Sequence, residues 1–254
     1  MGAGANRPPP HALAEDTFYK SFSEKQLTSY GSGRRSRIER HRLALLHRYA
    51  SPPGTMFEIG PGHGTLGELA VAAGWRYTAV ETSPFLIDVL RKKGLTVLES
   101  WTPPFPMADA SADVVYADQI LEHMRGIDDA RQFTAEAWRS LKPGGHFFVV
   151  VPNYLKERGF FWDVDYTHNF VTTPRRMTQL LYDGGFEVRH MERAIGISTG
   201  VARDALSAAK LLVNFPGVDT LSRYTGTDDL IFKIRKNLFE TLTFVAQKPA
   251  EASR

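Results

Sequence analysis

The stretch MFEIGPGHGTL, residues 56–66, decides the fold of this chain. An apolar run carries the acid Glu58 near its end, and glycines then occupy every second position, at Gly60, Gly62 and Gly64. Glycine accepts positive φ and lets the backbone approach a ligand closely. The pattern that follows is helical. We therefore expect a buried parallel strand, a tight turn and a helix N-terminus that faces a ligand.

The same glycines allow more than one interpretation. Gly62-x-Gly64-x-x-Gly67 matches the dinucleotide-binding pattern, but Gly60 already takes the first place after the strand, two residues after an acid. The pattern E-x-G-x-G-x-G resembles the loop that binds S-adenosylmethionine (SAM) in class I methyltransferases. A nicotinamide or flavin site and a structural glycine turn remain the alternatives.

Length and composition narrow the class of protein. The 254 residues suffice for one large α/β domain with a small lid, and 43% hydrophobic with 23% charged residues excludes global disorder. The net charge of +3 makes no case for nucleic acid as a partner. The absence of cysteine excludes disulfides and thiolate-bound zinc or iron–sulfur sites.

No apolar run reaches membrane-spanning length, and the N-terminus lacks the apolar segment of a signal peptide. We therefore expect a cytoplasmic protein with no membrane span. A homodimer is compatible with these features.

Local composition predicts three parts. Residues 1–15 are rich in proline and glycine and are expected to form a flexible tail. Residues 16–50 are expected to form an N-terminal helical lid, and residues 51–254 the main domain, with an insert of one or two helices at about 195–237. Arginines at the start of the lid helix can meet the carboxylate of SAM or lie in solvent: Arg34, Arg35 and Arg37.

Acids at further strand ends support the resemblance. Glu81 closes the second predicted strand, 21 residues after Gly60, where nucleotide-binding βαβ units place an acid on the ribose hydroxyls. A helix-capping acid before Pro84 is the alternative. After the third strand, Glu99 can accept a hydrogen bond from adenine, and Trp101 can stack on its ring or fill the core.

Two later motifs also resemble the family. The fourth strand ends at Asp118 and is followed by Leu-Glu-His at 121–123, and a Leu-Lys-Pro-Gly-Gly turn at 141–145 precedes the fifth strand. The likeness covers roughly residues 50–190 and the last strand. It implies that the cofactor is bound by side chains and backbone at the strand ends: Glu58, Gly60, Gly62, Gly64, Glu81, Thr82, Glu99, Ser100, Trp101, Asp118 and Gln119.

The implied fold is α/β and Rossmann-like. It has a seven-stranded, mostly parallel sheet with helices on both faces and an antiparallel last strand. The N-terminal helical segment and the insert lie outside the likeness, and we expect them to recognise the acceptor.

The catalytic candidates are two histidines beyond the strand ends. His168 is the predicted general base, because Asp165 lies three residues before it and can orient the ring. His123 is either a second base or a support for the cofactor loop. The segment after the fifth strand is aromatic and acidic, and its expected substrate contacts are Tyr154, Trp162, Asp165 and Tyr166.

A bound Mg²⁺ is the other way to acidify a hydroxyl. Asp118 and Asn153 follow strands four and five, where catechol-type methyltransferases hold magnesium, and Asp163 or Asp165 can complete an oxygen set. Pro152 stands where those enzymes have an acid. The metal therefore stays an open alternative.

The favoured function is a SAM-dependent O-methyltransferase acting on a small-molecule or oligosaccharide acceptor. The chain resembles methyltransferases of polysaccharide biosynthesis, including those of the mycobacterial methylmannose kind. The first alternative is a natural-product, quinone or phenol methyltransferase. A SAM-binding protein without catalysis and a nicotinamide oxidoreductase are the alternatives from other classes.

Overall fold

A seven-stranded sheet forms the centre of the computed structural model, which describes residues 29–250. The strand order is β3-β2-β1-β4-β5-β7-β6, and β7 runs antiparallel to both of its neighbours. This confirms the predicted Rossmann-like fold class. The strands are β1 (Thr55–Ile59), β2 (Arg76–Glu81), β3 (Val97–Glu99), β4 (Ala112–Asp118), β5 (Leu141–Pro152), β6 (Glu187–Ile195) and β7 (Glu240–Gln247). The expected tail, 1–15, and residues 16–28 of the expected lid lie outside the described residues.

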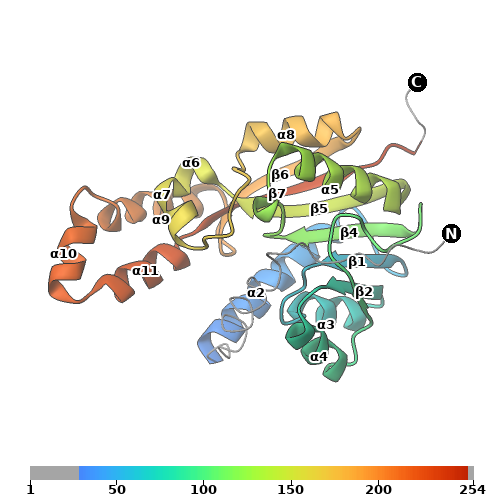
Figure 1. The fold of residues 1–254 in the computed structure, drawn as a ribbon, viewed down its shortest axis with the longest axis horizontal. Coiled ribbons are helices and arrows are strands. Elements are labelled where there is room, and N and C mark those ends of the chain that lie inside the picture. The colour runs from blue at the N-terminus through green and yellow to red at the C-terminus, as the bar shows by residue number, and fades with distance from the viewer. Residues whose placement is uncertain (1–28, 251–254) are drawn as a thin grey trace.

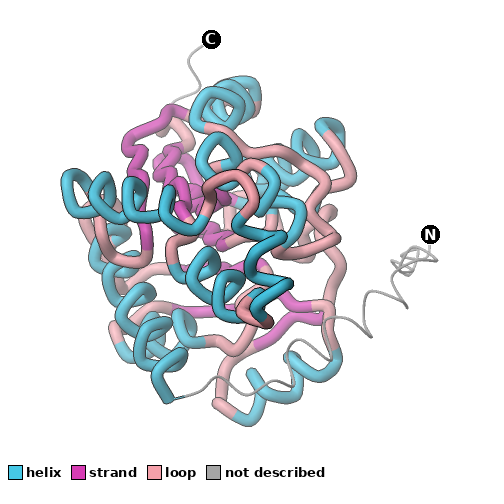
Figure 2. Tube along the Cα trace, turned by 90° about the vertical axis from the view of Figure 1, so that its left-hand side faces the viewer, coloured by secondary structure: helices cyan, strands magenta, loops and turns pink. Residues whose placement is uncertain are grey.

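Helices cover both faces of this sheet (Figures 1 and 2). One face carries α2 (Ser29–Leu46), α3 (Thr65–Ala72) and α4 (Pro84–Lys92), and the other carries α5 (Ile127–Ser140) and α8 (Pro174–Asp183). Between residues 29 and 250, no helix is both long enough and apolar enough to cross a bilayer.

The core consists of two hydrophobic layers, one on each face. Along β5, Phe147 and Val149 pack toward α5, whereas Phe148 and Val150 pack toward α2 and α3. This alternation follows from the two-residue period of a strand. All four side chains are fully buried, so the centre of the sheet is apolar on both faces, as a covered parallel sheet requires.

Two short helices and a helical turn follow the carboxyl ends of the central strands. The turn η1 (Leu121–His123) follows β4, and the helices α6 (Tyr154–Glu157) and α7 (Gly159–Asp163) follow β5. Parallel strands end at one edge of the sheet, so these segments lie together at that edge.

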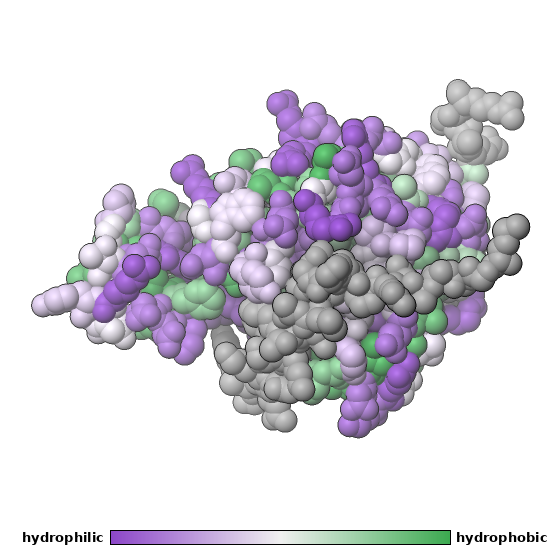
Figure 3. All heavy atoms as spheres, viewed as in Figure 1, coloured by the Kyte–Doolittle hydropathy of each residue, from purple (hydrophilic) through white to green (hydrophobic). Residues whose placement is uncertain are grey.

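The insert between β6 and β7 is more helical than the sequence predicts. It contains α9 (Gly200–Ala209), η2 (Lys210–Val213), α10 (Val218–Thr225) and α11 (Asp228–Asn237), where one or two helices were expected. These helices project from the carboxyl edge of the sheet (Figure 1). Helices α9 and α11 bury none of their residues, and hydrophobic and hydrophilic spheres interleave on this lobe in Figure 3.

Buried charges join the insert to the sheet. Lys210 of η2 forms an ion pair with Glu157 of α6, and both side chains are buried. The other carboxylate oxygen of Glu157 accepts the backbone N–H of Glu240 at 2.8 Å. The insert is thereby attached to the end of β5 and the start of β7.

Candidate active site

The glycine loop after β1 adopts the predicted conformation. Gly60, Gly62 and Gly64 have φ of 64°, 55° and 73°. A Cβ on Gly60 would lie 2.3 Å from Ile120, and one on Gly64 would lie 2.5 Å from Leu90, so packing requires these two glycines. A Cβ on Gly62 would meet nothing within 4 Å. Gly62 therefore marks the part of the loop that a ligand can approach.

Glu58 lies beneath this loop. It is buried, and its Oε2 accepts a hydrogen bond from the Tyr77 hydroxyl at 2.5 Å. Burial raises the pKa of Glu58 to about 8, and the Tyr77 bond opposes this shift. A Cβ on Gly67 would lie 2.7 Å from the Tyr77 ring, so this pair also supports the packing of α3. A ligand contact by Glu58 remains a prediction.

Glu81 ends β2 as predicted and is buried. Its Oε1 accepts the backbone N–H groups of Thr82 at 2.7 Å and Ser83 at 3.0 Å, as the helix-capping alternative expects. Burial raises the pKa of Glu81, and the two backbone bonds oppose it. Within residues 29–250, the hydrogen bonds of Glu81 use Oε1, so Oε2 can still accept from a ribose hydroxyl.

Buried polar atoms without partners mark the same edge of the sheet. Among the described residues, Thr82 Oγ1, Ser83 Oγ and Asp118 Oδ1 are buried and make no hydrogen bond. Buried polar groups are normally paired. Thr82 and Ser83 follow β2 and Asp118 ends β4, and such positions at the carboxyl edge of the sheet fit a hydroxyl-bearing and charged cofactor such as SAM.

The segment after β3 lies next to Glu81. Glu99 pairs with Glu81 in the β2–β3 register and is exposed. The Ser100 N–H donates to the Glu81 carbonyl at 3.1 Å, and Trp101 is half-buried. These positions leave the predicted adenine contacts of Glu99, Ser100 and Trp101 as predictions.

Asp118 at the end of β4 is held by helix α2. Its Oδ2 accepts from Arg42 at 2.6 Å and from Arg35 at 2.9 Å, and both arginines also pair with Glu39. Asp118, Arg42 and Glu39 are buried. Arg35 and Arg42 thus neutralise side chains of the protein itself, while Arg34 donates to the backbone of Asn237.

The predicted Mg²⁺ set around Asp118 does not assemble. Asp118 Oδ2 is already neutralised by two guanidinium groups, and the Asn153 amide donates to Glu240 at 2.6 Å. Asp163 is exposed, and Asp165 Oδ1 accepts from the Thr167 backbone and hydroxyl. Each of these side chains therefore contacts other protein groups or faces solvent, and they do not form one set of metal ligands.

Gln119, directly after Asp118, has a left-handed backbone with φ of 55°, and its N–H donates to the Val150 carbonyl at 2.8 Å. This conformation is strained for a residue with a side chain. It turns the chain from β4 into η1, which carries Glu122 and His123.

Glu122, His123 and His168 form a cluster beyond β4 and β5. One carboxylate oxygen of Glu122 and one ring nitrogen of each histidine lie within 4.8 Å of one another. The Glu122 carbonyl accepts the N–H groups of Asn169 at 2.8 Å and Phe170 at 2.9 Å, which brings the His168 segment against η1. The sequence predicted both histidines as site residues, and the structure places their ring centroids 5.0 Å apart.

Hydrogen bonds set the tautomers in this cluster. His168 Nδ1 lies 2.6 Å from the Phe161 carbonyl, which can only accept, so Nδ1 carries the proton. His123 Nδ1 lies 2.7 Å from Thr167 Oγ1, whose hydroxyl donates to Asp165 at 2.7 Å. Asp165 therefore orients His123 through Thr167, and the expectation that it orients His168 is wrong.

Burial keeps both imidazoles neutral. It lowers the pKa of His123 to about 4, with a further contribution from His168, and it lowers the pKa of His168. Burial also raises the pKa of Glu122 well above its usual range.

Aromatic side chains border the cluster. Tyr154 is half-buried and packs edge-to-face on Phe161 and Trp162. Trp162 is 43% exposed and Tyr166 is 63% exposed. The substrate contacts predicted for Tyr154, Trp162 and Tyr166 remain predictions.

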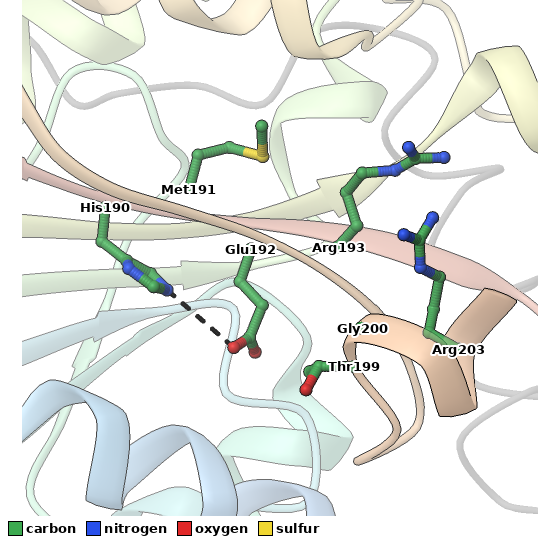
Figure 4. A pocket seen from close by; sticks show the side chains of 7 residues that line it. All are labelled: His190, Met191, Glu192, Arg193, Thr199, Gly200 and Arg203. Carbon is green, nitrogen blue, oxygen red and sulfur yellow. Dashed lines mark ion pairs between the residues drawn. The ribbon is translucent and has the colours of Figure 1, made fainter.

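Two cavities lie next to the insert. One, of about 470 Å³, separates the start of α2 from the insert and is lined by aliphatic side chains and two arginines: Ile38, Ile195, Ile197, Leu206, Leu238, Arg34 and Arg37. The other, of about 350 Å³, lies between β6 and the start of α9 (Figure 4). Arg193 and Arg203 lie side by side there (Figure 4). Their guanidinium groups pair with the buried carboxylate of Glu240 at 2.9 Å and 3.6 Å, so this cavity is bordered by charges that already have partners.

Sequence reasoning did not select Glu122 or Thr167. The acid directly before His123 in the Leu-Glu-His triplet was a usable signal for Glu122, because neighbouring acid and imidazole groups can share a site. For Thr167 no local signal exists, since its role depends on contacts with His123 and Asp165.

The comparisons agree with this geometry. Residues 57–149 match the family model described as a methyltransferase domain. This segment of the chain is similar to that domain. The match includes the glycine loop, Glu81 and the start of the cluster.

Relatives and solved structures extend this result. A probable S-adenosylmethionine-dependent methyltransferase of Mycolicibacterium smegmatis is 29% identical over 69% of this chain and 65% of that protein. A malonyl-[acyl-carrier protein] O-methyltransferase of Methylococcus capsulatus is 28% identical over 72% of each chain. A phosphoethanolamine N-methyltransferase of Haemonchus contortus, solved with S-adenosylhomocysteine, has a TM-score of 0.58 at 16% identity, covering 84% of this chain and 53% of that chain, and shows the shared fold.

Residues 57–149 are thus similar to a methyltransferase domain, and the fold is one that solved methyltransferases share. The chain spans less than two thirds of the Mycolicibacterium relative. The acceptors named for the other two proteins differ in chemistry. The activity of this chain is therefore argued below from its own residues.

Replacing Arg42 by leucine should lower the free energy of unfolding by about 3 kcal/mol, because it leaves the buried Asp118 and Glu39 with less compensation. The control is Lys92→Met, which removes an exposed ion pair with Asp88 and should cost less than about 1 kcal/mol. Urea titrations would measure both. Equal free energies of unfolding for the two variants would contradict the proposed contribution of the Asp118 ion pairs to stability.

Alanine at Gly62 and at Gly60 should separate ligand binding from packing. Gly62→Ala should strain the backbone by about 1–2 kcal/mol and weaken SAM binding at least tenfold, because the new methyl group enters the open side of the loop. Gly60→Ala should destabilise the fold further, through its clash with Ile120. Calorimetry and thermal melting would distinguish the two effects; unchanged SAM affinity in Gly62→Ala would remove this loop from the cofactor site.

Glu81→Ala should weaken SAM binding at least tenfold, about 1.4 kcal/mol, because it removes the acceptor predicted for the ribose hydroxyls. The exposed Glu99 provides the comparison, and Glu99→Ala should have a smaller effect. Isothermal titration with SAM is the measurement. An affinity equal to that of the unmodified protein would assign Glu81 to helix capping alone.

Proposed function

We propose that this protein transfers the methyl group of SAM to a hydroxyl group of a small-molecule acceptor, and that the hydroxyl is activated at the Glu122–His123–His168 cluster. The observation that carries this proposal is the pair of neutral imidazoles with fixed tautomers at the carboxyl edge of the sheet. A hydroxyl is a poor nucleophile while protonated, so a nearby proton acceptor accelerates its attack.

The position of the cluster supports this role. Ligands of open α/β sheets bind beyond the carboxyl ends of the strands. Ile120, two residues before Glu122, packs against Gly60 of the glycine loop. The cluster therefore adjoins the loop predicted to hold SAM, and SAM, when bound, supplies an electrophilic methyl group on a sulfonium.

The protein's own residues position and deprotonate the acceptor. His168 is held by the Phe161 carbonyl, and His123 by Thr167 and Asp165, so both rings are oriented before the acceptor binds. Orientation of this kind lowers the barrier of an in-line displacement. Asp165 thereby keeps a role at the site, although through His123.

A carbohydrate or oligosaccharide acceptor is the favoured class. Trp162 and Tyr166 expose aromatic rings on the segment that carries His168, and the apolar faces of sugar rings pack on such surfaces. The named O-methylation of the Methylococcus relative supports oxygen as the methylated atom. The link to polysaccharide biosynthesis is part of this proposal.

A phenol, quinone or other natural product is the second candidate. The observation that favours it is the cavity of about 470 Å³ between α2 and the insert, which is lined by five aliphatic side chains beside Arg34 and Arg37. An apolar acceptor with an anionic group would fit this lining. A screen with labelled SAM, of mono- and oligosaccharides against phenols and quinones, discriminates the two classes.

His168→Ala should lower kcat by about 10²–10⁴ while SAM affinity stays within twofold, because the ring acts on the acceptor and not on the cofactor. His123→Ala should affect both quantities, since η1 adjoins the glycine loop. Transfer of labelled methyl and SAM calorimetry measure the two effects. A normal kcat in His168→Ala, with a large loss in His123→Ala, would move the activating role to His123.

A further inference from the structure

The cavity of about 470 Å³ between the start of α2 and the insert has a lining of two kinds. Five of its side chains are aliphatic, and two carry guanidinium groups. The aliphatic ones come from α2, from the end of β6 and the turn after it, from α9 and from the residue after α11: Ile38, Ile195, Ile197, Leu206 and Leu238. Small-molecule sites are usually clefts of about 300–1,000 Å³ with an apolar lining and a few polar groups. This cavity has both properties.

The charge at the cavity is positive. Arg34 is half-buried and donates one N–H to the Asn237 carbonyl at 2.9 Å, which leaves further donors on its guanidinium group. Arg37 is exposed, and its side chain has no ion-pair partner among the described residues 29–250. The lining residues all lie within that range, and none of them is acidic or aromatic. An anionic group is therefore complementary to the two guanidinium groups, and an aliphatic chain to the rest of the lining.

Hydrogen bonds hold the walls of the cavity in place. The bond from Arg34 to Asn237 joins α2 to the end of α11. The turn between Ile195 and Ser198 is closed by two backbone bonds of 3.0 Å, so the wall that carries Ile197 is formed without a ligand. A cavity that is already formed loses less conformational entropy when a ligand binds.

We propose that this cavity binds an aliphatic carboxylate or alkyl phosphate, with the anionic head group at Arg34 and Arg37 and the chain among the aliphatic side chains. A guanidinium group suits both kinds of anion, because two parallel N–H groups match two of their oxygens. An aliphatic chain is favoured over an aromatic ring, because the lining offers no ring for stacked or edge-to-face contacts. Binding of the chain removes half-exposed side chains such as Leu206 and Leu238 from water.

The cavity lies on a different side of α2 from the Asp118 ion pairs. Arg34 and Arg37 line the cavity. Arg35 and Arg42 pair with Asp118. With 3.6 residues per turn, the two pairs of arginines are centred roughly 120° apart around the helix axis. A ligand can therefore occupy the cavity while the Asp118 ion pairs stay intact.

This inference does not rest on the proposed function. A phenol or quinone acceptor would itself be methylated, whereas the aliphatic anion binds without SAM and without reacting. Saturable binding of the anion with no methyl transfer to any hydroxyl would refute the proposed function alone. Methyl transfer by a protein that binds no aliphatic anion would overturn this inference alone.

The test is calorimetry on the full chain, with neither SAM nor acceptor present. Decanoate should bind saturably at one site per chain, and about tenfold more tightly than octanoate, because two more methylene groups are buried. Decanol, which lacks the charge, and para-hydroxybenzoate, which carries the charge on a ring, should bind at least tenfold more weakly than decanoate. Absence of saturable decanoate binding, or tighter binding of para-hydroxybenzoate, would overturn the proposal.

Decyl phosphate distinguishes the two head groups, because it carries the same chain as decanol and a different anion from decanoate. Tighter binding of decanoate assigns the cavity to a carboxylate, and tighter binding of decyl phosphate assigns it to a phosphate. Equal binding of decanol and both anions would overturn the proposal, since the guanidinium groups would then have no part in recognition.

Variants locate the ligand. Arg37→Gln should weaken decanoate binding at least tenfold, because a charge-assisted hydrogen bond is lost. The matched control is Arg40→Gln, which changes an exposed arginine of the same helix outside the cavity lining and should leave binding within twofold. Binding kept in Arg37→Gln would place the head group elsewhere and overturn the proposal.

A second pair of variants tests the aliphatic part of the lining. Leu206→Asn should weaken decanoate binding at least tenfold, because the chain would then pack on a polar amide. Val201→Asn, on the same helix and at a position that is 85% exposed, should leave binding within twofold. Circular dichroism would check that the variants are folded, and Arg37→Gln alone is decisive if Leu206→Asn does not fold. Equal binding by folded Leu206→Asn and Val201→Asn would place the chain outside the cavity and overturn the proposal.

Discussion

The charge on Asp118 is the constraint on which the arrangement of the site depends. Its carboxylate lies at the end of a central strand, buried between the sheet and helix α2, and it is compensated by Arg35 and Arg42. A buried charge without a partner is far more costly than a paired one. Helix α2 therefore has to dock in one register on the sheet. That docking closes one side of the region beyond β4 in which Gln119, Glu122 and His123 follow.

The sequence predicted the parts of the molecule that local patterns determine. The strand at 55–59, the three positive-φ glycines and the helix beginning at Pro84 follow from periodicity and from glycine and proline chemistry. The partners of Asp118 do not follow, because Arg35 and Arg42 are 83 and 76 residues away in sequence. Arginines at the start of a helix can face solvent, bind a cofactor or pair with a buried acid, and the sequence pattern is the same in all three cases.

In the histidine cluster, even contacts between residues that are close in sequence could not be predicted from the sequence pattern. The spacing Asp-x-x-His correctly brought Asp165 into the site, yet the carboxylate contacts Thr167 and acts on His123. Spacing along a loop defines distance but not direction, since one change of backbone torsion turns a side chain to another neighbour. The direction is set here by the Glu122 carbonyl, which fixes the backbone at Asn169 and Phe170. That contact joins two segments that no local pattern relates.

The contacts described above also suggest which parts of the chain face the cofactor and which face the acceptor. The matched methyltransferase domain ends at residue 149, so it contains the glycine loop, Glu81, Glu122 and His123 but not His168 or the insert. The second part is joined to the first by the pairing of β7 with β5 and by the Glu122 carbonyl, which accepts the N–H groups of Asn169 and Phe170. Backbone contacts of this kind fix a position without fixing the side chains around it. The exposed side chains of the insert and of α7 can therefore vary while the geometry around Glu122, His123 and His168 is kept.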